Sequence, residues 1–108
     1  PHALVQWPGG GPADPAAASA LLWETYHELL GAVERPVRRG EHGDTVDPYN
    51  LLVTRRWMLV VPRSREHFEG VSFNALAFAG ALLVRSDDQL RVLRDRGCMA
   101  ALRHVTEV

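Results

Sequence analysis

The sequence predicts an α+β fold, in which helices pack on a small antiparallel sheet. Three observations predict this class: helical periodicity over residues 14–35, β-favouring residues between 49 and 61, and a helix start at residue 86. The chain has 108 residues, enough for one domain with a modest core. Its hydrophobic and charged contents, 46% and 23%, are ordinary for a globular protein.

The clearest helix is predicted over residues 14–35. Asp14 is a suitable N-cap, and Pro15 fits the first helical position because its missing N–H would have no partner there. Apolar residues then recur at helical spacing and form one stripe: Leu22, Tyr26, Leu29, Leu30 and Val33. We expect His27 at the edge of this stripe, as a packing residue and not as a catalytic base.

Two segments have no regular pattern. Residues 1–12 combine three consecutive glycines with flanking prolines, and are predicted to be a linker segment before a domain over residues 13–108. Residues 36–48 are rich in Arg, Gly, Asp and Pro and are predicted to be a mobile loop. Its acidic and histidine side chains are not expected to hold a metal ion, because no helical histidine pair or Cys-x-x-Cys fixes their geometry. These side chains are Glu41, His42, Asp44 and Asp47.

Residues 49–66, YNLLVTRRWMLVVPRSRE, contain the densest β-type apolar run of the chain. Residues 49–54 and 57–61 favour strands, and their weak alternation indicates strands covered on both faces. The intervening Thr-Arg-Arg-Trp has no Gly, Asn or Asp for a tight turn, so we expect a wider bend or bulge. Pro62 should end the second strand because it has no N–H to donate.

The strongest candidate site follows that strand. Arg63, Ser64 and Arg65 emerge where the buried strand ends, and donors held there are positioned more firmly than donors on a free loop. Two guanidinium groups and a hydroxyl suit a phosphate-rich ligand. The alternative is that these residues solvate the strand end or form ion pairs with Glu66 and Glu69.

Residues 71–85 are apolar and rich in small side chains. Periodicity does not separate a strand from a buried helix here, although Asn74 and Gly80 favour extended structure. Asn74 is interpreted as a turn residue or, less favoured, as a ligand contact.

The last part of the chain is predicted to be helical. Residues 86–89, Ser-Asp-Asp-Gln, have the spacing of a capping box, which would begin a helix that runs through Arg96. Ion pairs at i, i+4 are expected to support this helix, with Arg91 between Asp87 and Asp95. Gly97 should end it, and a last short helix should follow.

Composition limits the partners. The net charge of −1 gives no field that favours nucleic acid or an anionic membrane, and no apolar run reaches the roughly 18 residues of a membrane span. The twelve basic residues are all arginine, as in proteins of GC-rich genomes. One cysteine, Cys98, excludes an internal disulfide and suits a reducing cytoplasm. Without a P-loop, a dinucleotide fingerprint or a Gly-x-Ser-x-Gly elbow, the residues alone predict a small α+β domain with one candidate anion-binding segment.

Tyr49 to Glu66 resembles the signature of the C-terminal domain of ATP adenylyltransferases. These are the diadenosine tetraphosphate phosphorylases of the histidine-triad-like superfamily. The resemblance continues with Val-Ser-Phe-Asn-Ala-Leu at 71–76, Phe-Ala-Gly at 78–80 and Leu-Leu-Val at 82–84. It covers nearly the whole chain, and a linked run of motifs is more specific than any single one. The resemblance implies the C-terminal half of a histidine-triad-like fold.

The resemblance also implies an activity. Such enzymes split a dinucleoside polyphosphate with inorganic phosphate into ATP and ADP, or catalyse the reverse. A histidine attacks the α-phosphate and forms a nucleotidyl-enzyme, while positive groups and a divalent ion such as Mg²⁺ stabilise the phosphate charge. That histidine belongs to a His-x-His-x-Gln motif of the N-terminal domain. Here, residues 1–6 read Pro-His-Ala-Leu-Val-Gln, with Ala3-Leu4 where the second histidine would stand, and they are interpreted as the family's linker segment.

We therefore expect a C-terminal domain whose catalytic histidine lies in an N-terminal domain of the same protein. The chain would have no cofactor of its own, and the divalent metal would belong to the intact enzyme. Arg63 and Arg65, with Ser64 between them, are expected to contact phosphate or the polyphosphate of ATP, ADP or diadenosine tetraphosphate. Asn50 and Asn74 are expected to hold the cleft or the nucleotide.

Two alternatives from other classes stay open. The first is a non-catalytic nucleotide-binding or regulatory module, which calorimetric titration with ATP would identify. The second is a structural module that docks on a partner subunit, which an exposed apolar sheet edge would favour.

Overall fold

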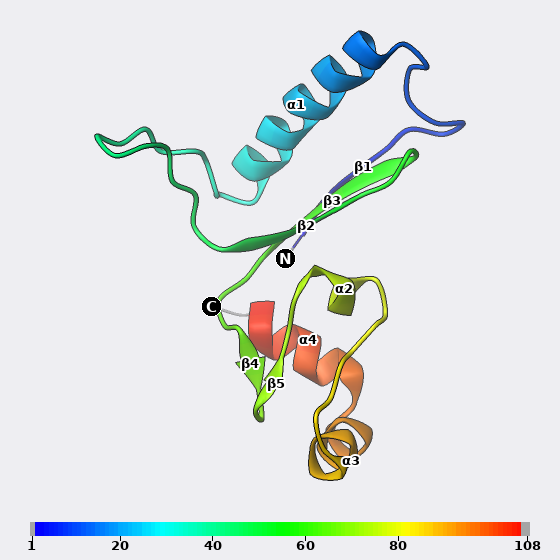
Figure 1. Ribbon diagram of the computed structural model, residues 1–108, viewed down its shortest axis with the longest axis vertical. Coiled ribbons are helices and arrows are strands. Elements are labelled where there is room, and N and C mark those ends of the chain that lie inside the picture. Colours follow the sequence, from blue (N-terminus) through cyan, green and yellow to red (C-terminus); the bar gives the residue numbers. More distant parts are fainter. Residues whose placement is uncertain (1, 107–108) are drawn as a thin grey trace. The chain divides into compact units, whose positions relative to one another are not determined.

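The computed structural model describes residues 2–106, and the chain divides into two units, one up to Pro62 and one from Arg63 (Figure 1). The first unit holds β1 (Ala3–Gln6), α1 (Pro15–Ala32), β2 (Tyr49–Val53) and β3 (Trp57–Pro62). The second holds β4 (His67–Phe68), β5 (Val71–Ser72), α2 (Ala75–Phe78), α3 (Asp87–Arg96) and α4 (Cys98–Thr106). The predicted α+β class is confirmed, since antiparallel sheets and helices occur in one chain.

The sheet of the first unit has the order β1-β3-β2, and both pairings are antiparallel. β2 and β3 match the two predicted strands, and their register runs from Tyr49 opposite Pro62 to Val53 opposite Met58. β1 lies in residues 1–12, where the sequence predicted no strand, and Pro1 lies outside the described residues. The strand was missed because its four residues gain their structure from pairing with β3, which leaves no local pattern.

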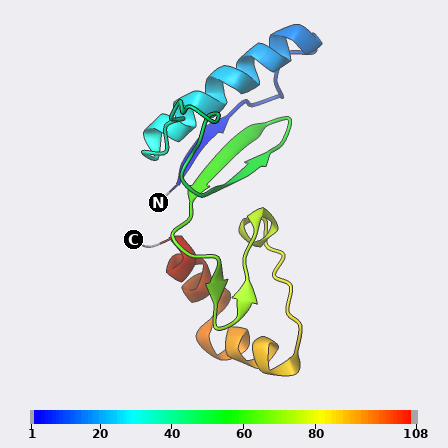
Figure 2. The same cartoon turned by 60° about the vertical axis from the view of Figure 1, so that its left-hand side comes forward.

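α1 confirms the predicted helix and covers one face of this sheet (Figure 2). The Asp14 carboxylate accepts a hydrogen bond from the Ala17 N–H at 3.0 Å, and Pro15 occupies the first turn. The helix ends at Ala32, earlier than predicted, because Glu34 takes a positive φ of 58° and the Arg35 N–H turns back to the Leu30 carbonyl at 2.7 Å. Pro36 therefore follows a helix that has already ended.

The connection between β2 and β3 is tighter than predicted. The Thr54 N–H donates to the Trp57 carbonyl at 2.9 Å, which closes the turn around Arg55 and Arg56. The Thr54 hydroxyl accepts hydrogen bonds from the N–H groups of Arg56 and Trp57 at 3.2 and 3.1 Å. The expected wider bend was wrong because a threonine hydroxyl satisfies the turn's donors without a residue at positive φ.

The second unit contains a hairpin that the sequence analysis did not predict. β4 and β5 pair with His67 opposite Ser72, and the two turn residues Glu69 and Gly70 have φ values of 50° and 81°. Two successive positive φ values are typical of the tight turns that match strand twist. Residues 71–85 are extended only at Val71–Ser72, so the extended structure that the sequence favoured there is largely replaced by α2 and irregular chain.

α3 and α4 confirm the predicted C-terminal helices. The Ser86 hydroxyl caps α3 by accepting from the Gln89 N–H at 3.2 Å. The return bond differs from a capping box, because the Gln89 amide oxygen accepts from the Arg85 N–H at 2.7 Å. Arg91 pairs with Asp88 at 3.7 Å and not with the predicted i, i+4 partners. Gly97, at a φ of 87°, separates the two helices.

Each unit has its own apolar core. In the first, buried residues of α1 meet the central strand: Leu29, Leu30, Met58 and Val60. In the second, the hairpin and the helices bury a larger set: Phe68, Val71, Phe73, Ala77, Leu93, Ala101 and Val105. Among the helices of residues 2–106, none has the length and apolar character that crossing a membrane requires.

Leu29→Ala should lower the free energy of unfolding by about 2–5 kcal/mol, because it leaves a cavity where a side chain only 3% exposed contacts the sheet. Urea denaturation followed by circular dichroism measures this change. Leu22→Ala is the matched control on the same helix, 38% exposed, and should cost less than about 1 kcal/mol. Equal losses for the two variants would contradict the assignment of the core.

Candidate functional site

Arg63 is held inside the second unit by two interactions. Its Nη1 donates to the Phe73 carbonyl at 3.3 Å, and its Nη2 lies 3.6 Å from a Glu66 carboxylate oxygen. The side chain is 19% exposed, and its Nε is buried without a hydrogen-bond partner among the described residues. The ion pair with Glu66 is the structural alternative raised from the sequence, so the predicted phosphate contact of Arg63 competes with a contact that the fold already makes.

Ser64 and Arg65 bind the C-terminal end of α4. The Ser64 N–H and hydroxyl donate to the Val105 carbonyl at 2.8 and 3.1 Å, and the Arg65 N–H donates to the same oxygen at 3.2 Å. The Arg65 Nη1 donates to the His104 carbonyl at 2.7 Å. The last carbonyls of a helix lack helical partners and carry partial negative charge, so a guanidinium is a favourable cap there. Phosphate binding by these residues stays a prediction.

The two predicted asparagines lie in different units. Asn50, in β2 opposite Val61, is 7% exposed, and its Nδ2 is buried without a partner among the described residues. Asn74 caps α2, because its side-chain oxygen accepts from the Leu76 N–H at 2.9 Å, which confirms the turn interpretation. Asn74 also borders a small polar pocket of about 310 Å³, which it shares with His67, Gly70, Ser72, Leu83, Arg85 and Gln89.

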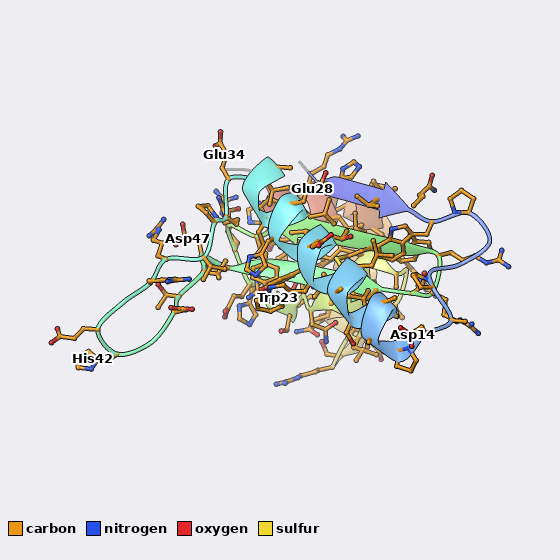
Figure 3. The ribbon with its side chains drawn as sticks, turned by 90° about the horizontal axis from the view of Figure 1, so that it is seen from above. Asp14, Trp23, Glu28, Glu34, His42 and Asp47 are labelled. Carbon is orange, nitrogen blue, oxygen red and sulfur yellow. The ribbon has the colours of Figure 1, made fainter. Side chains whose placement is uncertain are left out.

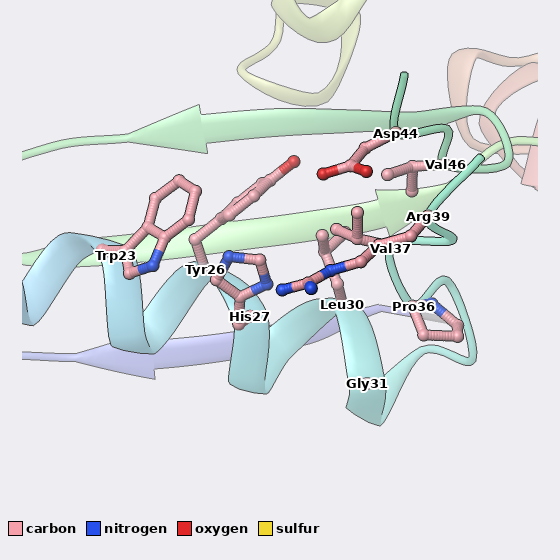
Figure 4. Close-up of a pocket in the computed structure, with 10 residues that line it drawn as sticks. All are labelled: Trp23, Tyr26, His27, Leu30, Gly31, Pro36, Val37, Arg39, Asp44 and Val46. Atoms are coloured by element: carbon pink, nitrogen blue, oxygen red, sulfur yellow. The ribbon is translucent and has the colours of Figure 1, made fainter. Parts of the chain in front are cut away.

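A larger pocket lies in the first unit, between the second half of α1 and the loop that follows it (Figure 4). Its volume is about 660 Å³, within the range of small-molecule sites. We call it the α1–loop pocket, and it is lined by Trp23, Tyr26, His27, Leu30, Gly31, Pro36, Val37, Arg39, Asp44 and Val46. None of these residues was among the predicted site residues.

Aromatic side chains form one wall of the α1–loop pocket. The Trp23 and His27 rings meet edge to face with centroids 4.4 Å apart, and the Tyr26 and His27 centroids are 5.3 Å apart. Trp23 is nevertheless 65% exposed, so much of its indole faces solvent. The Tyr26 hydroxyl is hydrogen-bonded to the Tyr49 hydroxyl of β2, which ties this wall to the sheet.

The loop closes on itself as a small hairpin. Arg38 and Thr45 exchange two backbone hydrogen bonds of 2.8 Å, and Arg38 also forms an ion pair of 2.9 Å with Asp47. Figure 3 shows Asp47 near the base of this loop and His42 at its far end. The predicted loop is therefore closed at its base. The two charged loop residues that line the pocket, Arg39 and Asp44, lie just inside the Arg38–Thr45 bridge.

Burial raises the pKa of the Tyr49 phenol to about 12, and the hydrogen bond and charge interaction with Tyr26 act in the same direction. The described residues contain no group of three or more His, Cys, Asp or Glu side chains that could hold a metal ion.

The fold defines a small α+β domain, and one pocket in it has the volume of a small-molecule site. The chain belongs to the family described as ATP adenylyltransferase C-terminal domain, which it matches over residues 2–107. It is thus a nucleotidyltransferase domain, and this membership implies that it binds nucleotide. The family resemblance noted in the sequence is confirmed. No curated protein and no solved structure matches the chain.

Sequence reasoning missed the α1–loop pocket because its parts look ordinary one by one. Tyr26 and Leu30 belong to an apolar helix stripe, and Trp23 lies beside it. Arg39 and Asp44 belong to a polar loop of several similar charges. The spacing of Trp23 and His27, one helical turn apart, was the one available indication of an aromatic face.

Tyr26→Phe should lower the pKa of Tyr49 from about 12 toward its ordinary 10.0, because the hydrogen bond that favours the protonated phenol is lost while burial remains. The chain has two tyrosines, so ultraviolet titration of this variant reports Tyr49 alone. In the unsubstituted chain the folded pKa exceeds the unfolded one, so this phenol's contribution to stability is complete below pH 10.0 and is lost as the pH rises toward 12. An unchanged pKa in the variant would exclude the Tyr26 contribution.

Proposed function

We propose that the chain is the C-terminal domain of an enzyme that phosphorolyses diadenosine tetraphosphate to ATP and ADP, or catalyses the reverse reaction. The observation that carries this proposal is the family match over residues 2–107, which spans both units of the chain. The nucleophilic histidine belongs to an N-terminal domain of the same protein, and this chain contributes half of a histidine-triad-like fold. The chain contributes binding groups to a reaction whose covalent step occurs elsewhere.

In this proposal the segment from Arg63 to Arg65 contacts the polyphosphate. Its geometry supports the role, because hydrogen bonds to α4 fix the backbone of Ser64 and Arg65, and so fix where the neighbouring guanidinium side chains start. A guanidinium forms charge-assisted hydrogen bonds, which are roughly twice as strong as hydrogen bonds between neutral groups. On phosphate binding, the Arg65 guanidinium would replace the His104 carbonyl by a phosphate oxygen, and the Arg63 guanidinium would replace the Glu66 carboxylate in the same way.

A divalent ion such as Mg²⁺ would neutralise phosphate charge in the intact enzyme. Because no cluster of three or more candidate ligands occurs in residues 2–106, none of the chain's residues is assigned to that ion. Asn50 and Asn74 are proposed to hold the cleft or the nucleotide. Of the two, Asn50 has the stronger support, since a buried amide N–H₂ without a partner costs free energy that a ligand acceptor would recover.

A structural docking role is the second candidate, and one observation favours it. β2 is an edge strand, and its Val53 is exposed beside Leu22 and Trp23 of α1. An open edge with apolar side chains is a typical site of association with another chain. Concentration-dependent association of the purified chain, with no response to nucleotide, would favour this candidate.

The purified chain should show no phosphorolysis of diadenosine tetraphosphate, because it has no histidine in a His-x-His-x-Gln context. Chromatographic detection of ATP and ADP after incubation with phosphate and Mg²⁺ is the measurement, with the intact enzyme as positive control. Clear turnover by the chain alone would refute the assignment of the nucleophile to an N-terminal domain. His2, His27 and His67 would then be the candidate nucleophiles.

In the intact enzyme, Arg63→Gln and Arg65→Gln should each lower kcat/KM by about ten- to a hundredfold, since each removes a charged donor to phosphate. Steady-state kinetics measures this loss, and circular dichroism checks that the second unit stays folded. Arg91→Gln is the matched control, because this exposed arginine of α3 pairs only with Asp88 among the ion pairs of the described residues. Normal kinetics in all three variants would assign Arg63 and Arg65 to the fold alone.

A further inference from the structure

The α1–loop pocket combines features that the family match does not assign to any ligand. Its floor is apolar and is formed by Leu30, Val37 and Val46. Its wall is aromatic, and the exposed indole of Trp23 leaves ring surface on which a planar group can stack. A flat, aromatic ligand body fits a cavity with this lining better than a flexible aliphatic chain does.

Two opposite charges face the same cavity. Figure 4 shows the Arg39 guanidinium directed toward His27 and the Asp44 carboxylate directed toward Tyr26. Neither side chain forms an ion pair within residues 2–106, although the neighbouring Arg38 is paired with Asp47. A carboxylate is acceptor-only and a guanidinium is donor-only, so the pocket offers one acceptor end and one donor end.

The loop hairpin explains why these two charges share the pocket. Arg38 and Thr45 form the backbone bridge, and Arg39 and Asp44 are the next residues inside it on either side of the loop. The Arg38–Asp47 ion pair lies outside the pocket lining, while Arg39 and Asp44 belong to it. The backbone bridge at the base of the loop thus brings Arg39 and Asp44 near each other, and both line the pocket.

We propose that the α1–loop pocket binds one amino-bearing purine nucleotide. The base stacks on the aromatic wall, its exocyclic amino group donates to the Asp44 carboxylate, and its phosphate accepts from the Arg39 guanidinium. Stacking, an acceptor for the amino group and a cation for the phosphate are the three recognition elements that such a ligand requires. The assignment of a nucleotide as the ligand rests on the proposed function, and the pocket residues and their roles are new.

Calorimetric titration of the 108-residue chain with AMP tests the site. A single shallow subsite should bind AMP with a dissociation constant on the order of 0.1–1 mM. Purine riboside 5′-monophosphate, which lacks the amino group, and adenosine, which lacks the phosphate, should each bind about tenfold more weakly. These two analogues separate the Asp44 contact from the Arg39 contact.

Three variants assign the contacts to residues. Asp44→Ala should bind AMP and purine riboside 5′-monophosphate equally, and Arg39→Gln should bind AMP no better than adenosine. Trp23→Ala should weaken every ligand. The matched controls are Glu41→Ala, Arg55→Gln and Leu22→Ala, which change similar exposed residues of the first unit outside this pocket and should leave binding unchanged.

The proposal is overturned if AMP does not bind at millimolar concentration, or if the pocket variants and the controls bind AMP equally. Failure here is distinct from failure of the proposed function. If Trp23→Ala, Arg39→Gln and Asp44→Ala leave phosphorolysis by the intact enzyme unchanged, the proposed activity stands and the proposed nucleotide site is refuted. If the intact enzyme shows no phosphorolysis but the chain binds AMP more tightly than the two analogues, the nucleotide site stands and the proposed activity is refuted.

Discussion

The first unit depends on the pairing of β3 along both of its edges. β1 and β2 each hydrogen-bond to it, and its Met58 and Val60 side chains pack against α1. A central strand satisfies its backbone groups along both edges, and the burial of Met58, Val60 and Val61 accounts for its nearly continuous apolar sequence. Pro62 then removes a donor at the strand's end, so the ladder stops where the arginine segment starts.

A second constraint acts after Pro62. The chain from Ser64 to Arg65 must satisfy the last carbonyls of α4, and it does so with two backbone N–H groups, a hydroxyl and a guanidinium. The same donor types would recognise phosphate. A segment that binds anions and a segment that caps a helix therefore have similar composition, and the sequence alone does not distinguish them. The structure shows the capping role, and the family supplies the reason to expect the other.

Local patterns predicted most of the regular structure. Asp14 and Pro15 start α1, Ser86 starts α3 and Gly97 ends it, because caps act through hydrogen bonds within a few residues. The errors lie where structure is set by distant or unusual partners. β1 exists because β3 is beside it, and the Thr54 turn uses a side-chain acceptor that composition rules do not count. The β4–β5 hairpin needed positive φ at Glu69, a residue with no preference for it.

The site was harder to predict than the fold for the same physical reason. Arginines after a strand are conspicuous in sequence, but a pocket is formed by residues from segments that are separate in the sequence. Trp23 and Asp44 both line the α1–loop pocket although 21 positions separate them in the chain, and no local sequence pattern predicts this proximity. Two features position the loop: the positive φ of Glu34, which ends α1, and the Arg38–Thr45 bridge, which brings Arg39 and Asp44 close together. The recognition groups of this pocket thus follow from one helix end and one backbone bridge.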